Sequence, residues 1–429
     1  MIKLVRGFKD ILPTETALWQ YVEATVRELL EDFGFAELRI PILEKTELFA
    51  RSIGAGTDIV EKEMYTFTDR KGDSLTLRPE ATASVVRAYI EHKFYAKDPV
   101  CKLYTIGPMF RRERPQKGRY RQFYQINAEV FGLHDPRADA ELIFLLMKFM
   151  NRLDLSGIVL HINSLGCHKC RPHFKDDLKT FLANRSEQLC SDCLRRRDEN
   201  PLRIFDCKVP TCKETMTDAP SILDRLCSKC RSHFNTVQDA LNMSHIPYET
   251  NHRLVRGLDY YTRTTFEVLA GALGAQDAVA GGGRYDGLVN ALGGPDQPGV
   301  GFAIGVDRLI ELLAGQVQGL EKRAHLFIAA LGDRAQDRAF QWVQDFRMQR
   351  FRTEMDLEDR SLKSQMRRAD KLEASYVLIV GDRELDEGAA VLRNMTTKEQ
   401  EKVPLQGLVG FVVSRIKTTI TGRNNEDRR

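Results

Sequence analysis

The sequence has no long apolar run, since no stretch of about 18 consecutive apolar residues occurs anywhere in its 429 residues. Its first fifteen residues, MIKLVRGFKDILPTE, also lack the apolar core of a secretory signal. These two absences exclude a membrane protein and predict a soluble, cytoplasmic one. In that reducing compartment, the nine cysteines are expected to be free thiols or metal ligands rather than disulfides.

A strong excess of charge of one sign is absent too. Lys and Arg together number 64 and Asp and Glu 60, which leaves a formal net charge of +4. The molecule is therefore no histone-like polycation, and a nucleic-acid partner would have to meet local basic patches. With 42% hydrophobic and 29% charged residues, the composition is that of a globular protein, and the length provides for about two or three domains.

One short segment concentrates a cation, a carboxylate and two phenols. It is LVRGLDYY, residues 254–261, and a β-rich run with alternating side chains, residues 262–268, follows it. Two interpretations remain open at this stage. The cluster is either a polar turn with a buried ion pair before an ordinary strand, or part of a binding site, because such clusters mark functional sites only in some proteins.

A second informative segment, residues 103–131, contains two β-rich runs and predicts an antiparallel pair of strands with a basic tip. The connecting loop carries Arg114, Lys117, Arg119 and Arg121. Alternation in the second run places Phe123, Gln125, Asn127 and Glu129 on one face. A sheet face wetted by solvent would show the same pattern. The nearby Arg111 and Glu113 favour a nucleotide site instead, because an aromatic ring stacks a base and a guanidinium binds phosphate.

Together with two glycine-containing segments, these residues resemble class II aminoacyl-tRNA synthetases, and specifically the histidyl-tRNA synthetase family. The second class motif is matched by FRRERPQKGRYRQF and the third by GVGFAIGVDR, residues 299–308. The motifs of the histidine enzymes are matched by LVRGLDYY and by GGGRYDG, residues 281–287. The resemblance extends from about Arg6 to Ile420, which is nearly the whole chain.

The resemblance implies an α+β catalytic domain with an antiparallel sheet at residues 1–160 and 249–314, interrupted by a helical, cysteine-rich insertion at residues 161–248. A linker at residues 315–324 would lead to an anticodon-binding domain at residues 325–420. Alternating strand and helix patterns by themselves predict a small α/β domain with a mixed sheet there. Residues 421–429 are expected to form a disordered tail.

The activity that the resemblance implies is ATP-dependent ligation of L-histidine to tRNA(His) through a histidyl-adenylate, with release of AMP and pyrophosphate. The enzyme would use ATP with Mg²⁺ and act as a homodimer. One alternative is a non-catalytic regulatory relative associated with ATP phosphoribosyltransferase, which would lack the anticodon domain and an intact LVRGLDYY-type motif. Another is a zinc-containing RNA-binding module, which would leave the arginines and Phe123 unexplained.

The resemblance also assigns roles to individual residues. Arg256 and Arg111 would be catalytic, and ATP would be bound by Arg111, Glu113, Phe123 and Arg308. Histidine would be bound by Glu80, Ala81, Thr82, Arg111, Gln125, Glu129, Arg256, Tyr260, Tyr261 and Tyr285. The tRNA would be contacted by Arg114, Lys117, Arg119 and Arg121. Two structural alternatives are that Thr82 caps a helix and that the glycines of residues 281–287 form a tight turn.

Eight of the nine cysteines lie in the insertion, where they form closely spaced pairs. Three pairs are C-x-x-C and one is spaced by four residues: Cys167/Cys170, Cys190/Cys193, Cys207/Cys212 and Cys227/Cys230. This spacing predicts one or two structural Zn²⁺ sites, with metal-free remnants of an ancestral site as the alternative. A thioredoxin-like redox pair is not favoured, because no βαβ pattern surrounds the cysteines.

Overall fold

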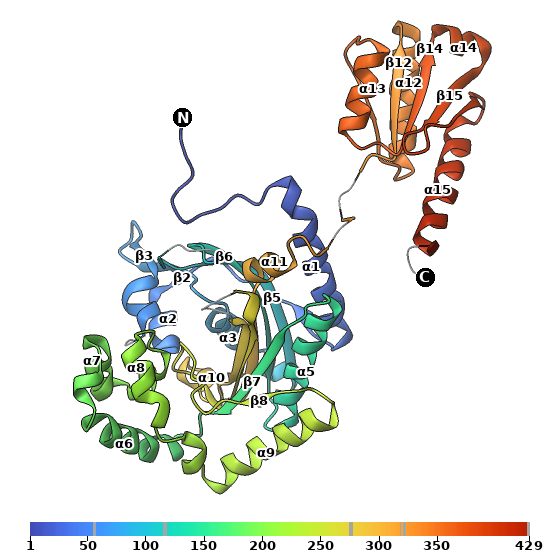
Figure 1. Cartoon of the computed structure of the whole chain (residues 1–429). Coiled ribbons are helices and arrows are strands. Elements are labelled where there is room, and N and C mark those ends of the chain that lie inside the picture. Colours follow the sequence, from blue (N-terminus) through green and yellow to red (C-terminus); the bar gives the residue numbers. More distant parts are fainter. Residues whose placement is uncertain (55–56, 115–117, 274–277, 318, 321–322, 427–429) are drawn as a thin grey trace. The chain divides into compact units, whose positions relative to one another are not determined.

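The structure is a computed structural model that describes residues 1–54, 57–114, 118–273, 278–317, 319–320 and 323–426 (Figure 1). The chain divides into two compact units, Met1–Leu320 and Glu321–Arg429, and each is described by itself. Among the described residues, no helix combines the length and the apolar composition that crossing a bilayer requires.

The first unit is built on an eight-stranded sheet with the order β1-β5-β6-β11-β10-β9-β7-β8. The outermost pair at each edge is parallel, and all other neighbours are antiparallel. The strands are β1 (Ala36–Glu37), β5 (Cys101–Phe110), β6 (Gln122–Phe131), β7 (Ile158–Ser164), β8 (Glu249–Thr250), β9 (Thr262–Ala270), β10 (Ala278–Arg284) and β11 (Gly299–Gly305). The predicted α+β fold with an antiparallel sheet is confirmed.

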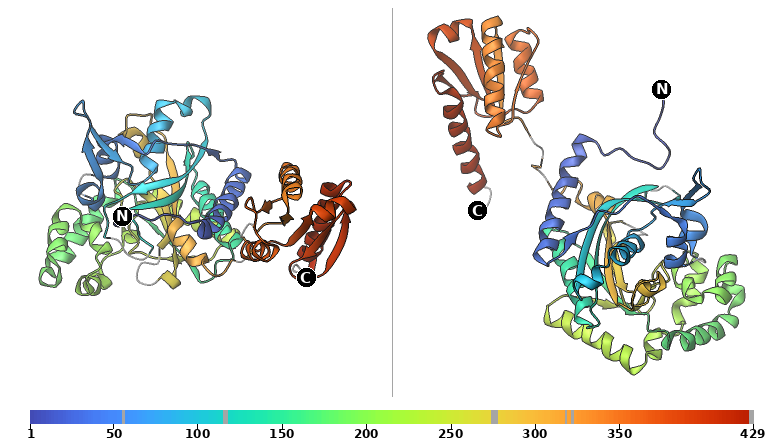
Figure 2. Two further views of the ribbon diagram at one scale, coloured as in Figure 1. Left: turned by 90° about the horizontal axis from the view of Figure 1, so that it is seen from above. Right: turned by 180° about the vertical axis from the view of Figure 1, so that it is seen from behind.

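Helices cover the two faces of this sheet unequally. On one face, α1 (Pro13–Asp32), α5 (Arg137–Arg152) and α11 (Val306–Leu313) share a hydrophobic core with Ile126, Ala128 and Val130 of β6. Figures 1 and 2 show α1 and α5 side by side there. On the other face, α3 (Thr82–Glu91) and α10 (Leu288–Ala291) pack beside the strands. The predicted alternation along β6 is therefore confirmed, and its polar side chains lie on the second face.

Shorter elements complete the part of this unit that surrounds the large sheet. A three-stranded sheet has the order β2-β4-β3. Its strands are β2 (Leu43–Lys45), β3 (Tyr65–Thr68) and β4 (Ser74–Leu77), and the accompanying helices are α2 (Thr46–Ile53), a π-helix (Ile59–Glu63) and α4 (Phe94–Lys97). Four residues, 78–81, connect β4 to α3, so this connection and the first residue of α3 bring Glu80 and Thr82 to the large sheet.

The glycine run at residues 281–283 does not form the turn offered as an alternative. These residues lie inside β10, paired with β9 on one side and β11 on the other. A Cβ on Gly282 would lie 2.2 Å from the carbonyl oxygen of Gly301, so the close approach of the strands requires glycine there. The glycines therefore serve strand packing, and the chain turns only after Arg284.

Arg284 ends β10 in the core rather than in a ligand site. Its side chain is fully buried, and its guanidinium lies 2.6 Å from Asp139 of α5. It also donates to the carbonyl oxygens of Leu133 and Asp135. Burial opposes ionisation of Asp139, but Arg284 and the hydrogen bond from His233 together outweigh it and lower the pKa of that carboxyl. Arg284 therefore ties β10 to α5 and is structural.

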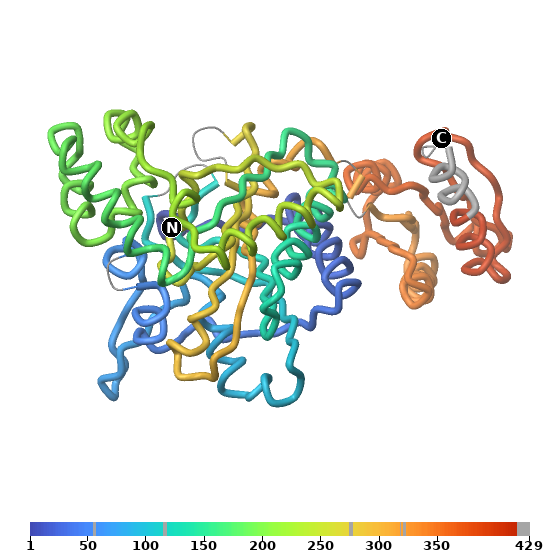
Figure 3. The backbone as a smooth tube through the Cα atoms, turned by 90° about the horizontal axis from the view of Figure 1, so that it is seen from below, coloured from blue at the N-terminus to red at the C-terminus, as the bar shows by residue number. Residues whose placement is uncertain are grey.

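The insertion is mainly helical, as expected. It contains α6 (Cys170–Ala183), α7 (Ser191–Glu199), α8 (Pro210–Thr215) and α9 (Ser228–Met243), joined by short 3₁₀ turns. The chain leaves the large sheet after β7 and returns to it through α9, a path that can be followed in Figure 3. Residues 161–164, placed in the insertion from the sequence, belong to β7, which pairs with β9 along its whole length.

The second unit has a five-stranded mixed sheet with the order β13-β12-β14-β15-β16, parallel across the first three strands and antiparallel thereafter. This confirms the predicted α/β domain. Its elements are β12 (Leu326–Leu331), α12 (Asp333–Met348), β13 (Thr353–Met355), α13 (Leu362–Lys371), β14 (Tyr376–Gly381), α14 (Asp382–Glu387), β15 (Ala389–Asn394), β16 (Gln400–Pro404) and α15 (Leu408–Glu426).

The end of the chain differs from the expected disordered tail. Helix α15 continues to Glu426, so residues 421–426 are helical, and residues 427–429 lie outside the described part of the chain. The helix passes Gly422 because a single interior glycine costs only about 1 kcal/mol relative to alanine.

Candidate active site

A cavity of about 250 Å³ lies on the polar face of the large sheet. Most of the predicted site residues line it: Glu80, Thr82, Arg111, Glu113, Arg119, Phe123, Gln125, Arg256, Tyr260, Tyr261 and Arg308. Ala81, Glu129 and Tyr285 are buried close to this lining. Arg114 and Arg121 are not among the lining residues, and Lys117 lies outside the described part of the chain. The fold therefore brings together residues from five separate segments.

Thr82 does not cap the helix that it begins. The N-terminal backbone of α3 is instead satisfied by the Glu80 carboxylate, which accepts hydrogen bonds from the amides of Thr82 (2.7 Å) and Ala83 (2.9 Å). Ala81 holds the N-cap position. Because Glu80 does the capping, the Thr82 hydroxyl is available for another contact.

That contact is Glu129, at the inner end of the site. Its two carboxylate oxygens accept hydrogen bonds from the hydroxyls of Thr82 (2.7 Å) and Tyr285 (2.5 Å). Burial raises the pKa of Glu129 to about 8, although the two hydroxyls favour its ionised form. A Cβ on Gly301 would lie 1.6 Å from this carboxylate, so glycine is required opposite it. Glu129 is thus held in a preformed polar network.

Two amides on β6 present polar atoms without a protein partner to the cavity. Within the described residues, the buried side-chain oxygens of Gln125 and Asn127 accept no hydrogen bond. Buried unpaired acceptors are costly, so such atoms favour a ligand that donates to them. Asn127 was absent from the predicted site residues, although its position on the polar face of β6 was visible in the alternation.

Arg256 of LVRGLDYY extends over β9 and β10. Its guanidinium donates to Glu267 of β9 at 2.7 Å, and its carbon lies 5.8 Å from the ring centre of Tyr261. Although burial opposes the charge, the Glu267 carboxylate keeps the pKa of Arg256 above its ordinary value. A Cβ on Gly281 would lie 2.4 Å from the guanidinium, so that glycine leaves room for it. The ion pair of the first interpretation is therefore present, half-buried, and it lines the cavity that the second interpretation requires.

Glu267 was missed at the level of sequence. Its signal was a single charged side chain within the otherwise uncharged run TTFEVLA of residues 264–270. The distance along the chain from Arg256 is 11 residues, and only the turn into β9 shows that the two side chains meet.

Arg111, Glu113 and Phe123 cluster at another part of the cavity. The Arg111 guanidinium lies 5.3 Å from the ring centre of Phe123 and donates to the carbonyl oxygen of Pro79 at 2.9 Å. Glu113 is 3.7 Å from Arg111 and accepts a hydrogen bond from Arg119 at 2.5 Å. An aromatic face, a cation and a carboxylate are thereby combined in one place, as a nucleotide site needs.

Arg308 approaches the cavity from the first turn of α11. Its guanidinium donates to the carbonyl oxygen of Ala278 on β10. The neighbouring Asp307 carboxylate accepts a hydrogen bond from the amide of Tyr124 at 2.7 Å, which anchors the helix to β6. A cation at a helix N-terminus opposes the helix dipole, so this position favours an anionic ligand.

The three described cations of the basic loop differ in their surroundings. Arg114 is exposed. Arg119 is ion-paired with Glu113, and Arg121 donates to the carbonyl oxygens of Glu113 and Arg6. Two of the predicted tRNA contacts are thus engaged with the protein itself.

The insertion reaches the LVRGLDYY segment through two arginines that the sequence did not single out. Arg203 donates to the carbonyl oxygen of Gly257 (2.7 Å) and to Asp259 (3.1 Å). Arg171 donates to the carbonyl oxygens of Tyr261 and Leu165. No local pattern distinguished these residues from the other arginines of the insertion, since their partners in the LVRGLDYY segment lie more than 50 residues away in the chain.

The eight insertion cysteines form two clusters of four. The first cluster is Cys167, Cys170, Cys227 and Cys230, and the second is Cys190, Cys193, Cys207 and Cys212. The sulfur atoms within each cluster lie within 4.8 Å of one another, and none forms a disulfide. A tetrahedral Zn²⁺ with bonds of about 2.3 Å requires sulfur separations of about 3.8 Å. The sulfur atoms are 3.7 Å apart in Cys167/Cys170, 4.0 Å in Cys167/Cys227 and 3.9 Å in Cys190/Cys207. These distances fit the requirement, so each cluster could hold a metal ion.

The chain is similar to known proteins along nearly its whole length. A model described as histidyl-tRNA synthetase matches residues 7–309, and a model described as anticodon binding domain matches residues 325–415. The histidine–tRNA ligase of Desulfatibacillum aliphaticivorans is 60% identical over 416 residues, which cover 97% of this chain and 99% of that protein.

Two solved structures are similar across most of the chain. The apo histidyl-tRNA synthetase of S. aureus has a TM-score of 0.82 at 36% identity and covers 96% of this chain and 100% of its own. A protein described as an ATP phosphoribosyltransferase regulatory subunit/histidyl-tRNA synthetase from Bacillus halodurans has a TM-score of 0.64 at 18% identity. The similarity covers 89% of this chain and 98% of that protein. The second similarity concerns the fold alone.

Proposed function

The chain belongs to the histidyl-tRNA synthetase family, and from that premise we propose how its site performs the ATP-dependent charging of tRNA(His) with histidine. Relatives that are 57% to 60% identical are named histidine–tRNA ligase, and an anticodon-binding domain model matches the C-terminal unit. A non-catalytic regulatory function is therefore not favoured.

The observation that carries the proposal is the convergence of three guanidinium groups on one cavity. Arg111, Arg256 and Arg308 all line it, beside Phe123 and the unpaired amide oxygen of Gln125. Three cations in so small a space are stabilised by a polyanion such as a triphosphate. Mg²⁺ would share that charge, and the carboxylates of Glu113 and Glu267 offer the oxygen ligands it prefers.

In the first step, the carboxylate of histidine attacks the α-phosphorus of ATP and pyrophosphate leaves. Because that carboxylate is already ionised at neutral pH, the step needs positioning and charge stabilisation more than a general base. Arg256, oriented by Glu267, and Arg111 donate to the α-phosphoryl oxygens, where negative charge develops. Arg308 holds the γ-phosphate end, and Phe123 and Glu113 hold the adenine.

Histidine itself occupies the inner end of the cavity. Glu80, Thr82 and Gln125 receive its ammonium group, while Glu129, Tyr260 and Tyr261 surround its imidazole. Tyr285 supports Glu129 by its hydrogen bond, and Ala81 contributes through the backbone beside Glu80. Glu129 acts as an acceptor for an imidazole N–H, so an amino acid without such a donor leaves the carboxylate unpaired and is rejected.

In the second step, a hydroxyl of the terminal ribose of tRNA(His) attacks the carbonyl carbon of the adenylate and AMP leaves. We propose that the acceptor end is bound at the loop with Arg114, Lys117, Arg119 and Arg121, and that residues 325–420 bind the anticodon end. We propose that the catalytic domain comprises residues 1–160 and 249–314 together with residues 161–164 of β7, that the insertion comprises residues 165–248, and that residues 315–324 form the linker. We also propose that the enzyme is a cytoplasmic homodimer.

Histidine-dependent exchange of labelled pyrophosphate into ATP tests the function. The exchange is expected with histidine and not with other amino acids, because only histidine can pair with Glu129. Binding of histidine without exchange would support the regulatory alternative, and absence of both would contradict the assignment of the cavity.

We further propose that the insertion binds structural Zn²⁺ at its two cysteine clusters. Protein purified without chelators is then expected to contain about two equivalents of zinc per chain, measured by elemental analysis. The matched control is Cys101→Ser, since Cys101 lies in β5 outside both clusters and its loss should leave the zinc content unchanged. Less than about a tenth of an equivalent in the unaltered protein would contradict the proposal.

A further inference from the structure

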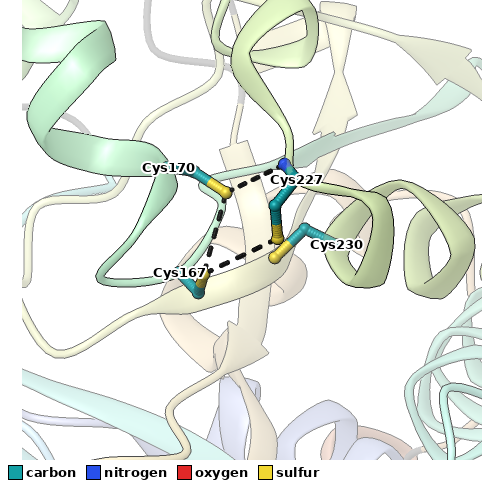
Figure 4. A group of neighbouring side chains, drawn as sticks. All are labelled: Cys167, Cys170, Cys227 and Cys230. Carbon is teal, nitrogen blue, oxygen red and sulfur yellow. Dashed lines mark hydrogen bonds between the residues drawn. The ribbon is translucent and has the colours of Figure 1, made fainter.

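The first cysteine cluster joins the two places where the insertion leaves and re-enters the catalytic domain. Cys167 and Cys170 lie at the start of α6, whereas Cys227 and Cys230 lie at the start of α9, about 60 residues later. Figure 4 shows the four side chains converging from these two segments. The amide of Cys227 also donates to the sulfur of Cys170 at 3.2 Å, which is the environment of a metal-bound thiolate. A metal ion here would close a long loop at its base.

The segment that carries the first two cysteines is connected directly to the histidine pocket. The amide of Arg263 donates to the carbonyl oxygen of Gly166 at 2.8 Å, and the amide of Leu165 donates to the carbonyl oxygen of Arg263 at 2.6 Å. Arg263 is two residues beyond Tyr261. The backbone around the first cluster is thus bonded to the backbone that follows LVRGLDYY.

Arg171, the residue after Cys170, makes the closest connection. Its guanidinium donates both to the carbonyl oxygen of Tyr261 and to that of Leu165. It thereby connects the LVRGLDYY segment to the backbone just before Cys167. The Tyr261 ring is buried, and its centre lies 4.6 Å from that of Tyr260. A shift of the Tyr261 backbone would therefore move both phenols that surround the imidazole.

From this arrangement we infer that the first cysteine cluster is a metal centre that positions Tyr261 for histidine recognition, with Arg171 as the positioning residue. The inference rests on the proposed synthetase function and on zinc in the insertion. The metal holds the start of α6, the start of α6 holds the Arg171 side chain, and Arg171 holds the Tyr261 carbonyl. Loss of either the metal or the Arg171 guanidinium therefore weakens the binding of histidine, because Tyr260 and Tyr261 are no longer held in position. The binding of ATP is not affected.

The test measures zinc content and pyrophosphate exchange in the full-length chain. Arg171→Met is expected to keep its zinc and to raise the KM for histidine by about 10-fold or more, since hydrogen bonds from charged donors contribute that much. The KM for ATP should stay within about twofold. Arg171→Lys should restore part of the histidine affinity. Cys230→Ser should lose about one equivalent of zinc and show the same selective rise.

Two further variants sharpen the result. The KM for histidine of the double variant Cys230→Ser/Arg171→Met should not exceed that of the single variant with the higher KM, because both changes break the same chain of contacts. Arg185→Met is the matched control, since Arg185 also donates to a backbone carbonyl of the insertion, that of Phe181, without reaching the pocket. Its KM for histidine should be unchanged.

Several outcomes would overturn the inference. They are an unchanged KM for histidine in Arg171→Met, a KM for ATP that rises equally, or zinc loss in Cys230→Ser with normal histidine binding. If Cys230→Ser does not fold, Arg171→Met and Arg171→Lys still decide. Unaltered protein that exchanges pyrophosphate but contains no zinc refutes this inference and the proposed zinc sites but leaves the proposed synthetase function standing, whereas protein that contains zinc but shows no exchange refutes the proposed function.

Discussion

Replacing Arg256 by alanine is expected to lower histidine-dependent pyrophosphate exchange by ~10²–10³-fold, because the change removes a preorganised donor from the place where charge develops. Glu267 holds the guanidinium at 2.7 Å, and Gly281 leaves the space that it occupies. The Nε of Arg256 is buried without a partner in the described part of the chain, so a donor is available for phosphate. The loss should appear in kcat rather than in the KM for either substrate.

The matched control for this variant is Arg253→Ala. Arg253 lies three residues upstream in the same irregular segment, but its side chain is exposed and donates to the carbonyl oxygen of Thr217. Its removal should change the exchange rate by no more than about twofold. An unaltered rate in Arg256→Ala, or an equal loss in both variants, would show that the segment matters for structure and not for phosphoryl transfer.

The Glu129→Gln variant is expected to bind histidine about 10- to 100-fold more weakly above pH 8, while ATP binding stays unchanged. The range corresponds to the loss of a hydrogen bond to a charged group, about 1.5–3 kcal/mol. Glutamine has nearly the same shape: its amide oxygen can accept from one of the two hydroxyls of Thr82 and Tyr285, and its amide nitrogen can donate to the oxygen of the other, so the network around it is preserved. Isothermal titration with histidine and with ATP separately measures the two affinities.

The pH dependence provides a further check on Glu129. Burial raises the pKa of this carboxyl to about 8, so below that pH it must lose a proton before it accepts an imidazole N–H. The difference in histidine affinity between the unaltered protein and Glu129→Gln should therefore widen as the pH rises towards 8 and level off above it. The imidazole of the ligand titrates equally in experiments with either protein. A pH-dependent change in the affinity difference is therefore due to Glu129. Equal loss of histidine and ATP affinity would instead indicate a structural role.

Many residues of the candidate site could be predicted from the sequence pattern around them, because they lie on regular helices and strands. The polar row of β6 was predicted from alternation, and the side chains of Gln125 and Asn127 do face the cavity. The alternation of strand and helix patterns in the C-terminal domain also predicted its α/β class and its mixed sheet, whereas the strand order came from the structure. A short polar helix such as α14, with sequence DRELDE, was missed because six residues without an apolar stripe carry no helical period.

Other predictions failed where a neighbouring chain segment decided the outcome. The glycines of β10 resemble a turn in isolation, but a strand on each side requires them to be small. Thr82 has a side chain that often caps a helix, yet the Glu80 carboxylate accepts the hydrogen bonds of the first amides of α3. The Thr82 hydroxyl donates to Glu129 instead. The strand beside the glycines and the partner of the Thr82 hydroxyl, Glu129, both lie far away in the chain, so local propensity could not reveal them.

By itself, the sequence determined the family motifs, the fold class, the face of β6 that bears the polar groups and the presence of closely paired cysteines. All of these depend on residues a few positions apart. Only the tertiary structure decided that the first cysteine pair joins the last, that the two middle pairs join each other, and that Arg171 and Arg203 meet the pocket segment. The physical reason is that these contacts close long loops, and their partners are chosen by packing of the whole unit rather than by spacing along the chain.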